Sequence, residues 1–148
     1  MKKLRVLVVL SVMLAAACGR GARGSSETGA AGGALATSLE VLIGERAVRL
    51  VLHVTNPTRE PVRLEFTSGQ RYDFVVRTAA GADVWRWSAD RMFMQALAAE
   101  TLAPGASLRY EAEWDAGGRT GSFEAVGTVV STNHRVEQKT RFELPGRF

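Results

Sequence analysis

Residues 48–67, VRLVLHVTNPTREPVRLEFT, contain two runs in which apolar and polar side chains alternate. The apolar positions of the two runs are Val48, Leu50, Leu52 and Val54, then Val62, Leu64 and Phe66. A period of two places successive side chains on opposite faces of a β-strand, so each run has one apolar face. Asn56 and Pro57 favour a turn after the first run. The segment therefore predicts two strands separated by a turn, each with one face buried in a core.

The same alternation continues toward the C-terminus, interrupted by turn-forming pairs such as Ser68-Gly69 and Pro104-Gly105. The further predicted strands are residues 72–77, 84–87, 108–115, 123–130 and 136–144. In the first of these, Tyr72 and Phe74 face inward and Asp73 faces outward. Strands at this spacing are typical of an antiparallel β-sandwich, and we expect an all-β fold of about seven to nine strands.

Residues 89–100, ADRMFMQALAAE, break the alternation. The stretch is rich in alanine, methionine, leucine and glutamate, which favour helix. We therefore expect a long connection between strands that contains one short helical turn. Long connections in compact domains often carry function, because they are exposed and sit on a rigid scaffold.

The N-terminal segment is typical of a bacterial secretion signal. Three basic residues precede an apolar run at 6–14, which leads through three alanines into Cys18. The run is too short to span a bilayer as a helix. Small residues before a cysteine resemble the lipobox at which bacterial lipoproteins are acylated and cut, although Ala15 stands where leucine is usual. We expect residues 1–17 to be a lipoprotein signal peptide and Cys18 to carry the lipid.

Residues 18–37 are rich in glycine, alanine, serine and threonine, a composition that predicts a flexible tether. Gly19, Gly21 and Gly24 match the G-x-G-x-x-G pattern of dinucleotide-binding sites. That pattern needs a strand before it and a helix after it, and the sequence indicates neither, so we exclude nucleotide binding. The folded domain is expected over residues 38–148.

Charge argues against nucleic acid as a partner. The formal net charge is +4, but three of the 19 basic residues lie in the predicted signal. The remaining 16 basic residues face 15 acidic ones, so the rest of the chain carries about +1. These charges alternate along the predicted strands and do not cluster on one face, as a nucleic-acid surface would require.

The sequence contains no pattern of catalytic or metal-binding residues. His53 lies on the outward face of a predicted strand and His134 at a hairpin, and neither has a second ligand at metal-binding spacing. No G-x-S-x-G or H-E-x-x-H motif occurs, and Cys18 is the sole cysteine. We therefore expect neither an enzyme nor a bound cofactor or metal.

The tryptophans suggest a role in packing or in contact with a partner. Trp85, Trp87 and Trp114 are the three tryptophans, and all lie in predicted strands. We expect all three rings to fill the core. In the alternative, Trp85 or Trp87 forms a contact patch with Arg86 and Arg91, because tryptophan and arginine dominate the energetic centres of interfaces.

Five strings, in this order, resemble the BsuPI-type intracellular proteinase inhibitor domain: SGQRYDF (68–74), VWRWS (84–88), MFMQAL (92–97), LAPGASL (102–108) and Trp114-Asp115. The resemblance extends over residues 48–130. It implies an immunoglobulin-like β-sandwich. It also implies inhibition of a bacterial subtilisin-type serine proteinase, the activity of the cytosolic inhibitor that gives the family its name.

Two classes of function remain open. The first is a lipid-anchored proteinase inhibitor that presents the connection 88–95 and the turn 68–71 to a proteinase cleft. Its candidate contact residues are Arg86, Arg91, Met92, Phe93, Gln70 and Arg71, and the sequence does not choose between Arg91, Met92 and Phe93 for the specificity pocket. The second is a non-inhibitory envelope binding or assembly module that holds a protein by strand pairing or an aromatic patch.

Both functions imply a protein partner, and the sequence leaves its identity and the oligomeric state open. Lipidation at Cys18 would place the domain in the cell envelope. By the sorting pattern of bacterial lipoproteins, Gly19 after the cysteine favours the outer membrane, facing the periplasm, if the cell has one.

Overall fold

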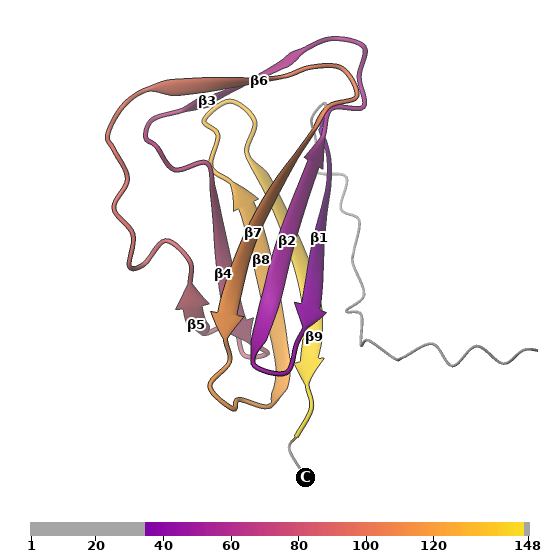
Figure 1. The fold of residues 1–148 in the computed structure, drawn as a ribbon, viewed down its shortest axis with the longest axis vertical. Coiled ribbons are helices and arrows are strands. Elements are labelled where there is room, and N and C mark those ends of the chain that lie inside the picture. The colour runs from indigo at the N-terminus through magenta and orange to yellow at the C-terminus, as the bar shows by residue number, and fades with distance from the viewer. Residues whose placement is uncertain (1–34, 147–148) are drawn as a thin grey trace, which may run out of the picture.

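The computed structural model describes residues 35–146, which form nine strands (Figure 1). One sheet has the order β1 (Ala36–Ile43), β2 (Ala47–Thr55), β7 (Ser107–Asp115). A second has the order β5 (Asp83–Arg86), β4 (Tyr72–Thr78), β8 (Gly121–Val129), β9 (Val136–Leu144). The remaining pair, β3 (Val62–Phe66) and β6 (Ala98–Leu102), lies across one end of these two sheets. All pairings are antiparallel, so the predicted all-β antiparallel sandwich is confirmed.

The core lies between the two larger sheets, extends to the β3–β6 pair and follows the predicted alternation. Its largest buried side chains include Trp114, Phe74, Leu50, Leu52 and Leu64. Val51 points to the outer face of β2 and is nevertheless 0 % exposed, because it lies between Glu40 of β1 and Glu111 of β7. Long charged side chains cover apolar surface with their methylene groups, so an outward position need not be exposed.

The prediction that all three tryptophan rings fill the core is correct for Trp114 alone. That ring is 2 % exposed and packs edge-on against Phe123, with ring centroids 5.4 Å apart. Trp85 and Trp87 are half-buried and pack against the margin of the core. They lie at the edge of their sheet because β5 and the residue after it have only β4 as a neighbour.

Contacts between β1 and β9 close one side of the sandwich. Gln138 Nε2 donates to Thr37 Oγ1 at 2.6 Å, and Thr140 Oγ1 donates to the Leu39 carbonyl at 2.8 Å. Gln138 and Thr140 are both buried, and these hydrogen bonds satisfy their polar groups. Because β1 begins at Ala36, Ala36 and Thr37 belong to the sheet, although we expected them in the tether.

A buried asparagine ties the β3–β6 pair to the rest of the sandwich. The Asn56 side-chain amide donates to the carbonyls of Glu60 at 2.7 Å and Leu102 at 2.9 Å. The backbone carbonyl of Asn56 accepts from Gly105 N–H at 2.7 Å, and Gly105 has a φ of 72°, which glycine adopts without strain. The predicted turn at Asn56 therefore also fixes the end of β6.

The expected helical turn within residues 89–100 is wrong: residues 35–146 contain no helix. Residues 87–90 form a turn, residues 91–97 are irregular, and Ala98 begins strand β6, which pairs with β3 in the register Phe66–Ala98 to Val62–Leu102. Helix propensity differs by less than about 1 kcal/mol per residue among these side chains. Pairing with β3 supplies backbone hydrogen bonds and buries Leu102, which outweighs that preference.

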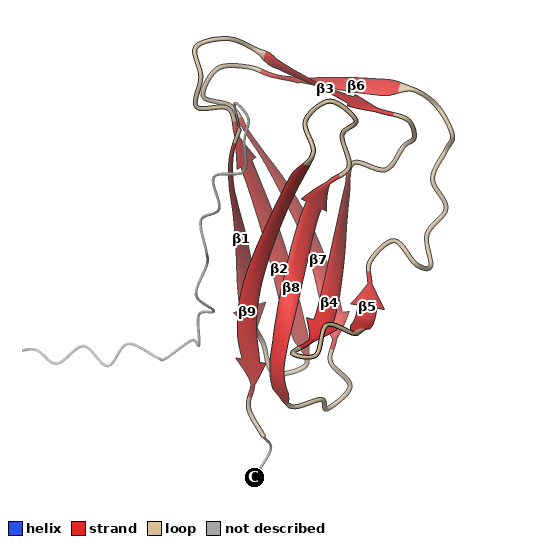
Figure 2. Cartoon of the chain, turned by 180° about the vertical axis from the view of Figure 1, so that it is seen from behind, coloured by secondary structure: helices blue, strands red, loops and turns tan. Residues whose placement is uncertain are grey.

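The predicted signal peptide, Cys18 and most of the predicted tether lie outside the described residues. Among residues 35–146, no helix is long and apolar enough to cross a membrane. Figure 2 shows the chain leaving β5 and running along one side of the molecule to the β3–β6 pair.

Candidate functional site

The connecting segment, residues 87–97, joins β5 to β6 and contains three of the six candidate contact residues, Arg91, Met92 and Phe93. Trp87 N–H donates to the Phe74 carbonyl at 2.9 Å, which extends the β4–β5 pairing by one residue. Two turns follow, in which Ala89 N–H donates to the Arg86 carbonyl and Arg91 N–H to the Ser88 carbonyl, each at 3.2 Å. The segment therefore leaves the sheet through a hydrogen-bonded turn.

A buried carboxylate holds the beginning of the connecting segment. Asp73 is 8 % exposed and accepts hydrogen bonds from Ser88 N–H at 3.1 Å and Ser88 Oγ at 2.7 Å. It also accepts from Arg86 Nη1 at 2.9 Å and from Phe74 N–H at 2.9 Å. Four donors thus satisfy one carboxylate, and two of them come from the first turn of the segment.

Arg86 was a candidate contact residue, and here it joins two carboxylates. Its guanidinium donates to Asp73 and, at 3.0 Å, to Asp83 Oδ2. The hydrogen bond to Asp73 is the main reason that the pKa of Arg86 is raised. The hydrogen bond from Arg77, at 2.7 Å, is the main reason that the pKa of Asp83 is lowered. The guanidinium of Arg86 therefore forms its hydrogen bonds within the fold, with Asp73 and Asp83, and is not a free contact group for a partner.

Aromatic stacking fixes the next part of the segment against the open side of the sandwich. The Trp87 ring stacks on Tyr72, with centroids 4.3 Å apart, and Tyr72 stacks on Tyr110 at 4.6 Å. The Arg91 guanidinium lies 4.4 Å from the Trp87 ring centroid, and Phe93 packs at 5.7 Å from the same ring. Trp87 thereby holds both Arg91 and Phe93, two of the three candidates for the specificity pocket.

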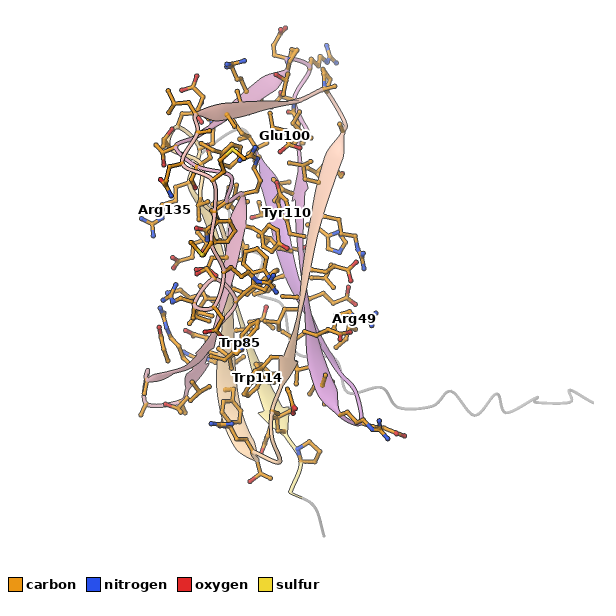
Figure 3. All side chains as sticks on the ribbon, turned by 60° about the vertical axis from the view of Figure 1, so that its left-hand side comes forward. Arg49, Trp85, Glu100, Tyr110, Trp114 and Arg135 are labelled. Atoms are coloured by element: carbon orange, nitrogen blue, oxygen red, sulfur yellow. The ribbon has the colours of Figure 1, made fainter. Side chains whose placement is uncertain are left out.

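Tyr110 lies at the inner end of this stack, between the two sheets (Figure 3). Burial, with a smaller contribution from the Glu100 carboxylate, raises the pKa of Tyr110 to about 12. Its hydroxyl is buried and has no hydrogen-bond partner within the described part of the chain. The Tyr72 hydroxyl, in contrast, donates to the Glu111 carbonyl of β7 at 3.4 Å. The stack thus bridges both sheets at the side opposite β1 and β9.

The other end of the connecting segment is held by the turn at residues 68–71. The Met94 carbonyl accepts from Gly69 N–H at 2.8 Å and from Ala96 N–H at 3.0 Å. A side chain at residue 69 would meet the Met94 backbone at 3.5 Å, so the two backbones are in close contact. The structure therefore brings together the two elements that the sequence named separately.

Gln70 and Arg71 stabilise this turn from within. Arg71 Nη1 donates to the Ser68 carbonyl at 2.8 Å, and its guanidinium lies 4.5 Å from the Phe66 ring centroid. Gln70 Nε2 donates to the Tyr72 carbonyl at 3.1 Å. Both candidate residues therefore have bonding partners in the fold, and their first role is to shape the turn.

Three large apolar side chains of the segment remain exposed between or beside these attachments. Met92 is 101 % exposed, Met94 77 % and Leu97 86 %. Arg91 and Phe93, on either side of Met92 in the sequence, are held on Trp87. Met92 is thus the one candidate for the specificity pocket that projects fully into solvent.

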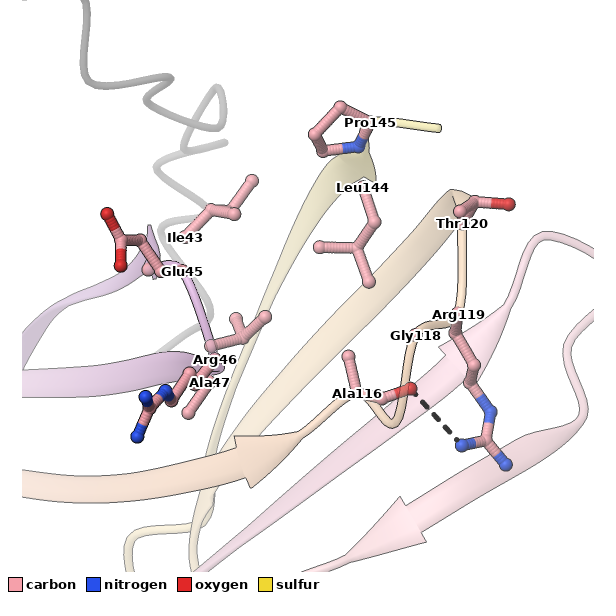
Figure 4. Close-up of a pocket in the computed structure, with 12 residues that line it drawn as sticks. Ile43, Glu45, Arg46, Ala47, Ala116, Gly118, Arg119, Thr120, Leu144 and Pro145 are labelled. Carbon is pink, nitrogen blue, oxygen red and sulfur yellow. Dashed lines mark hydrogen bonds between the residues drawn. The ribbon is translucent and has the colours of Figure 1, made fainter. Parts of the chain in front are cut away.

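Two shallow hollows border the connecting segment. One, of about 570 Å³, is lined by Tyr72, Trp87 and Arg91 with Arg49 and residues 111–113 of β7. The other, of about 350 Å³, lies beside Leu97 and includes Phe66, Thr67 and Ala98. A third hollow, of about 200 Å³, lies at the end of the sandwich away from the β3–β6 pair, between the β1–β2 turn and the end of β9 (Figure 4). It contains none of the candidate contact residues.

Among the described residues, no group of three or more histidine, cysteine, aspartate or glutamate side chains could hold a metal. His53 lies on the outer face of its sheet, with Nε2 at 3.9 Å from Glu40. His134 is half-buried in the β8–β9 connection.

Reasoning from the sequence missed Asp73 and Ser88, which hold the beginning of the segment. The alternation correctly put Asp73 on the outer face of β4, but nothing local indicated that the turn after β5 would cover it. The two residues are 15 positions apart, and only the β4–β5 pairing brings them together.

Comparison with known proteins adds a family assignment. A family model described as BsuPI, intracellular proteinase inhibitor, matches residues 35–134. No curated protein matches the chain. Among solved structures, a β-glucosidase from Erythrobacter marinus is similar at 16 % identity and a TM-score of 0.38, over 70 % of this chain and 14 % of that one. The GAE domain of GGA2p from Saccharomyces cerevisiae is similar at 14 % identity and a TM-score of 0.29, over 83 % of this chain and 100 % of that domain.

Proposed function

The chain belongs to the BsuPI family of intracellular proteinase inhibitors, and on that basis we propose that it inhibits a subtilisin-like serine proteinase through the connecting segment. The match covers residues 35–134, which include the whole segment and both elements that hold it. Family membership supports inhibition of a proteinase. The class of proteinase and the contact surface are our proposal.

One observation carries this proposal: an exposed apolar side chain stands between two attachments of the same segment. Asp73 and Trp87 hold the beginning, and Gly69 holds the Met94 carbonyl. Met92, between them, is 101 % exposed. With Met94 and Leu97, Met92 is one of three exposed large apolar side chains on a single short segment, and such a concentration is typical of a surface that binds another protein.

In the proposed complex, Met92 enters the primary specificity pocket of the proteinase. An apolar pocket would remove the methionine side chain from water, and tethering at both ends limits the conformational entropy lost when the segment is bound. Leu97 and Met94, which are also exposed, extend the apolar contact on the β6 side. Arg91 and Phe93 support the segment from beneath, through Trp87.

We further propose that Cys18 anchors the domain to a membrane of the cell envelope. Residues 19–34 would then separate the lipid from β1, and the inhibitor would act on proteinases within reach of that tether. The observation behind this part of the proposal is the cysteine directly after a short apolar run and three alanines.

The test compares two variants of the full chain that introduce the same charge at exposed positions. Met92→Asp should raise the inhibition constant against a subtilisin-type proteinase by about 30-fold, the size of a hot-spot loss. Thr120→Asp puts the charge in the exposed β7–β8 connection and should inhibit like the parent. Inhibition is measured as residual cleavage of a chromogenic peptide.

Equal inhibition by Met92→Asp and the parent would exclude the connecting segment as the contact surface. If the parent chain inhibits no subtilisin-type proteinase, the proposed activity is wrong and a non-inhibitory binding module becomes the better explanation. Thermal unfolding of both variants serves as the control, because neither position is buried and neither change should lower the midpoint.

A further inference from the structure

The connecting segment contains both methionines of the described part of the chain. Met92 and Met94 are 101 % and 77 % exposed. The other two methionines of the sequence, Met1 and Met13, lie outside the described residues, and the sole cysteine is Cys18. Within residues 35–146, the sulfur atoms are therefore confined to two exposed thioethers on one short segment.

The structure keeps these thioethers at the surface. Phe93, between them, packs on Trp87 with ring centroids 5.7 Å apart, and the Arg91 guanidinium lies over the same ring. The Met94 carbonyl is bonded to Gly69 and Ala96. The side chains on either side of Met92 and the backbone of Met94 are thus held in place, while both thioethers lie at the surface.

An exposed thioether is open to oxidation by peroxides. A hydroperoxide transfers its outer oxygen to the sulfur, so that an S–O bond forms and the O–O bond breaks. The thioether is oxidised to a sulfoxide by two electrons, and the peroxide is reduced to water or an alcohol. Methionine sulfoxide reductases reverse the step with a dithiol as reductant.

We propose that oxidation of Met92 to the sulfoxide is a reversible switch that turns off inhibition. The inference rests on the proposed function, because it assumes that Met92 fills an apolar pocket of the proteinase. A sulfoxide is polar and accepts hydrogen bonds, and burying it without a donor should weaken the complex by about tenfold or more. Oxidation of Met94, which lies farther along the segment, has a smaller effect.

The fold itself should tolerate the modification. Sulfoxides destabilise proteins when they form inside a core. Neither methionine belongs to the buried cluster between the sheets. Loss of inhibition without loss of stability is therefore the signature that separates a switch from oxidative damage.

The test treats the full chain with hydrogen peroxide and follows three quantities: the sulfoxide at each methionine, by mass spectrometry of peptides; the inhibition constant; and the unfolding midpoint. Conversion of Met92 should raise the inhibition constant by about tenfold or more, leave the midpoint unchanged, and be reversed by a sulfoxide reductase with dithiothreitol. The inhibition constant of Met92→Leu, whatever its value before treatment, should not change in peroxide. The matched variant Met94→Leu should still lose inhibition.

The failures are distinguishable. If the untreated chain inhibits and the fully oxidised Met92 form inhibits equally well, the switch is refuted and the proposed function stands. If Met92→Leu also loses inhibition in peroxide, another residue carries the sensitivity and the switch is refuted. If the untreated chain does not inhibit, the proposed function fails first, and the switch fails with it.

Discussion

Asp73 and Arg86 form an ion pair, but their removal should have very different consequences. The side chain of Asp73 is 11 % exposed and that of Arg86 is 43 % exposed. Solvent screens the charge of the half-exposed Arg86. The ion pair therefore contributes only about 0.5 kcal/mol to the free energy of unfolding. Ser88, in contrast, donates two hydrogen bonds to the buried carboxylate. Hydrogen bonds to a charged group contribute about 1.5 kcal/mol each at the low end of the usual range.

Asp73→Ala should therefore lower the free energy of unfolding by about 3 kcal/mol or more, since both Ser88 donors lose their acceptor and so does the Phe74 N–H. Ser88→Ala removes the hydroxyl donor alone and should cost about 1.5 kcal/mol. Arg86→Ala should cost about 0.5 kcal/mol or less, because three donors still satisfy Asp73 after the guanidinium is gone. The three losses rank the hydrogen bonds of Ser88 above the ion pair.

Urea denaturation followed by tryptophan fluorescence measures these differences, provided the dependence on urea concentration stays constant across the variants. The proposed inhibition supplies a second measurement. Loosening the first turn of the segment in Asp73→Ala should weaken inhibition even under conditions in which the domain stays folded. Equal destabilisation by Arg86→Ala and Asp73→Ala would show that the ion pair dominates, and the reasoning above would be refuted.

Two further predictions concern Tyr110 and Cys18. Tyr110→Phe removes a buried hydroxyl without a partner in the described chain, and should leave stability unchanged or raise it by about 1 kcal/mol. Burial raises the pKa of Tyr110 from 10.0 to about 12, so the parent should keep its full stability below pH 10 and lose part of it as the pH rises toward 12. The Tyr110→Phe variant should lose less stability over this pH range. An equal loss of stability in parent and variant would contradict the raised pKa of Tyr110 as its cause. Cys18→Ser should abolish incorporation of labelled fatty acid, and normal labelling of that variant would remove the basis for the proposed anchor.

Much of the fold could be predicted from the sequence because strand faces are a local property. Alternation at Val48 to Val54 and at Val62 to Phe66 depends on each residue and its immediate neighbours, and it correctly identified the inward positions of both strands. Seven of the nine observed strands correspond to predicted segments. The two missed strands are β1 and β6, and β6 lies in the stretch that we expected to include a helical turn.

The candidate site was predictable in part. The connection after β5 and the turn at 68–71 were both named from the sequence, but their contact through Gly69 and Met94 was not. Nor could the sequence separate Met92 from Phe93, which are adjacent and both apolar. Packing of Phe93 on Trp87 makes the distinction, and it depends on where Tyr72 places that ring.

The sequence by itself therefore determined the fold class and the inward face of the strands it identified, and it named the two elements that form the candidate site. These properties follow from side-chain period, turn residues and motif strings, which are all set within a few residues. The tertiary structure alone decided that residues 98–102 form a strand, that Asp73 is covered by Ser88, and that Met92 is exposed while Phe93 is held. Each of these outcomes depends on a contact between segments that are far apart in the chain or brought together by strand pairing. The energy of such a contact exceeds the local preference that the sequence expresses.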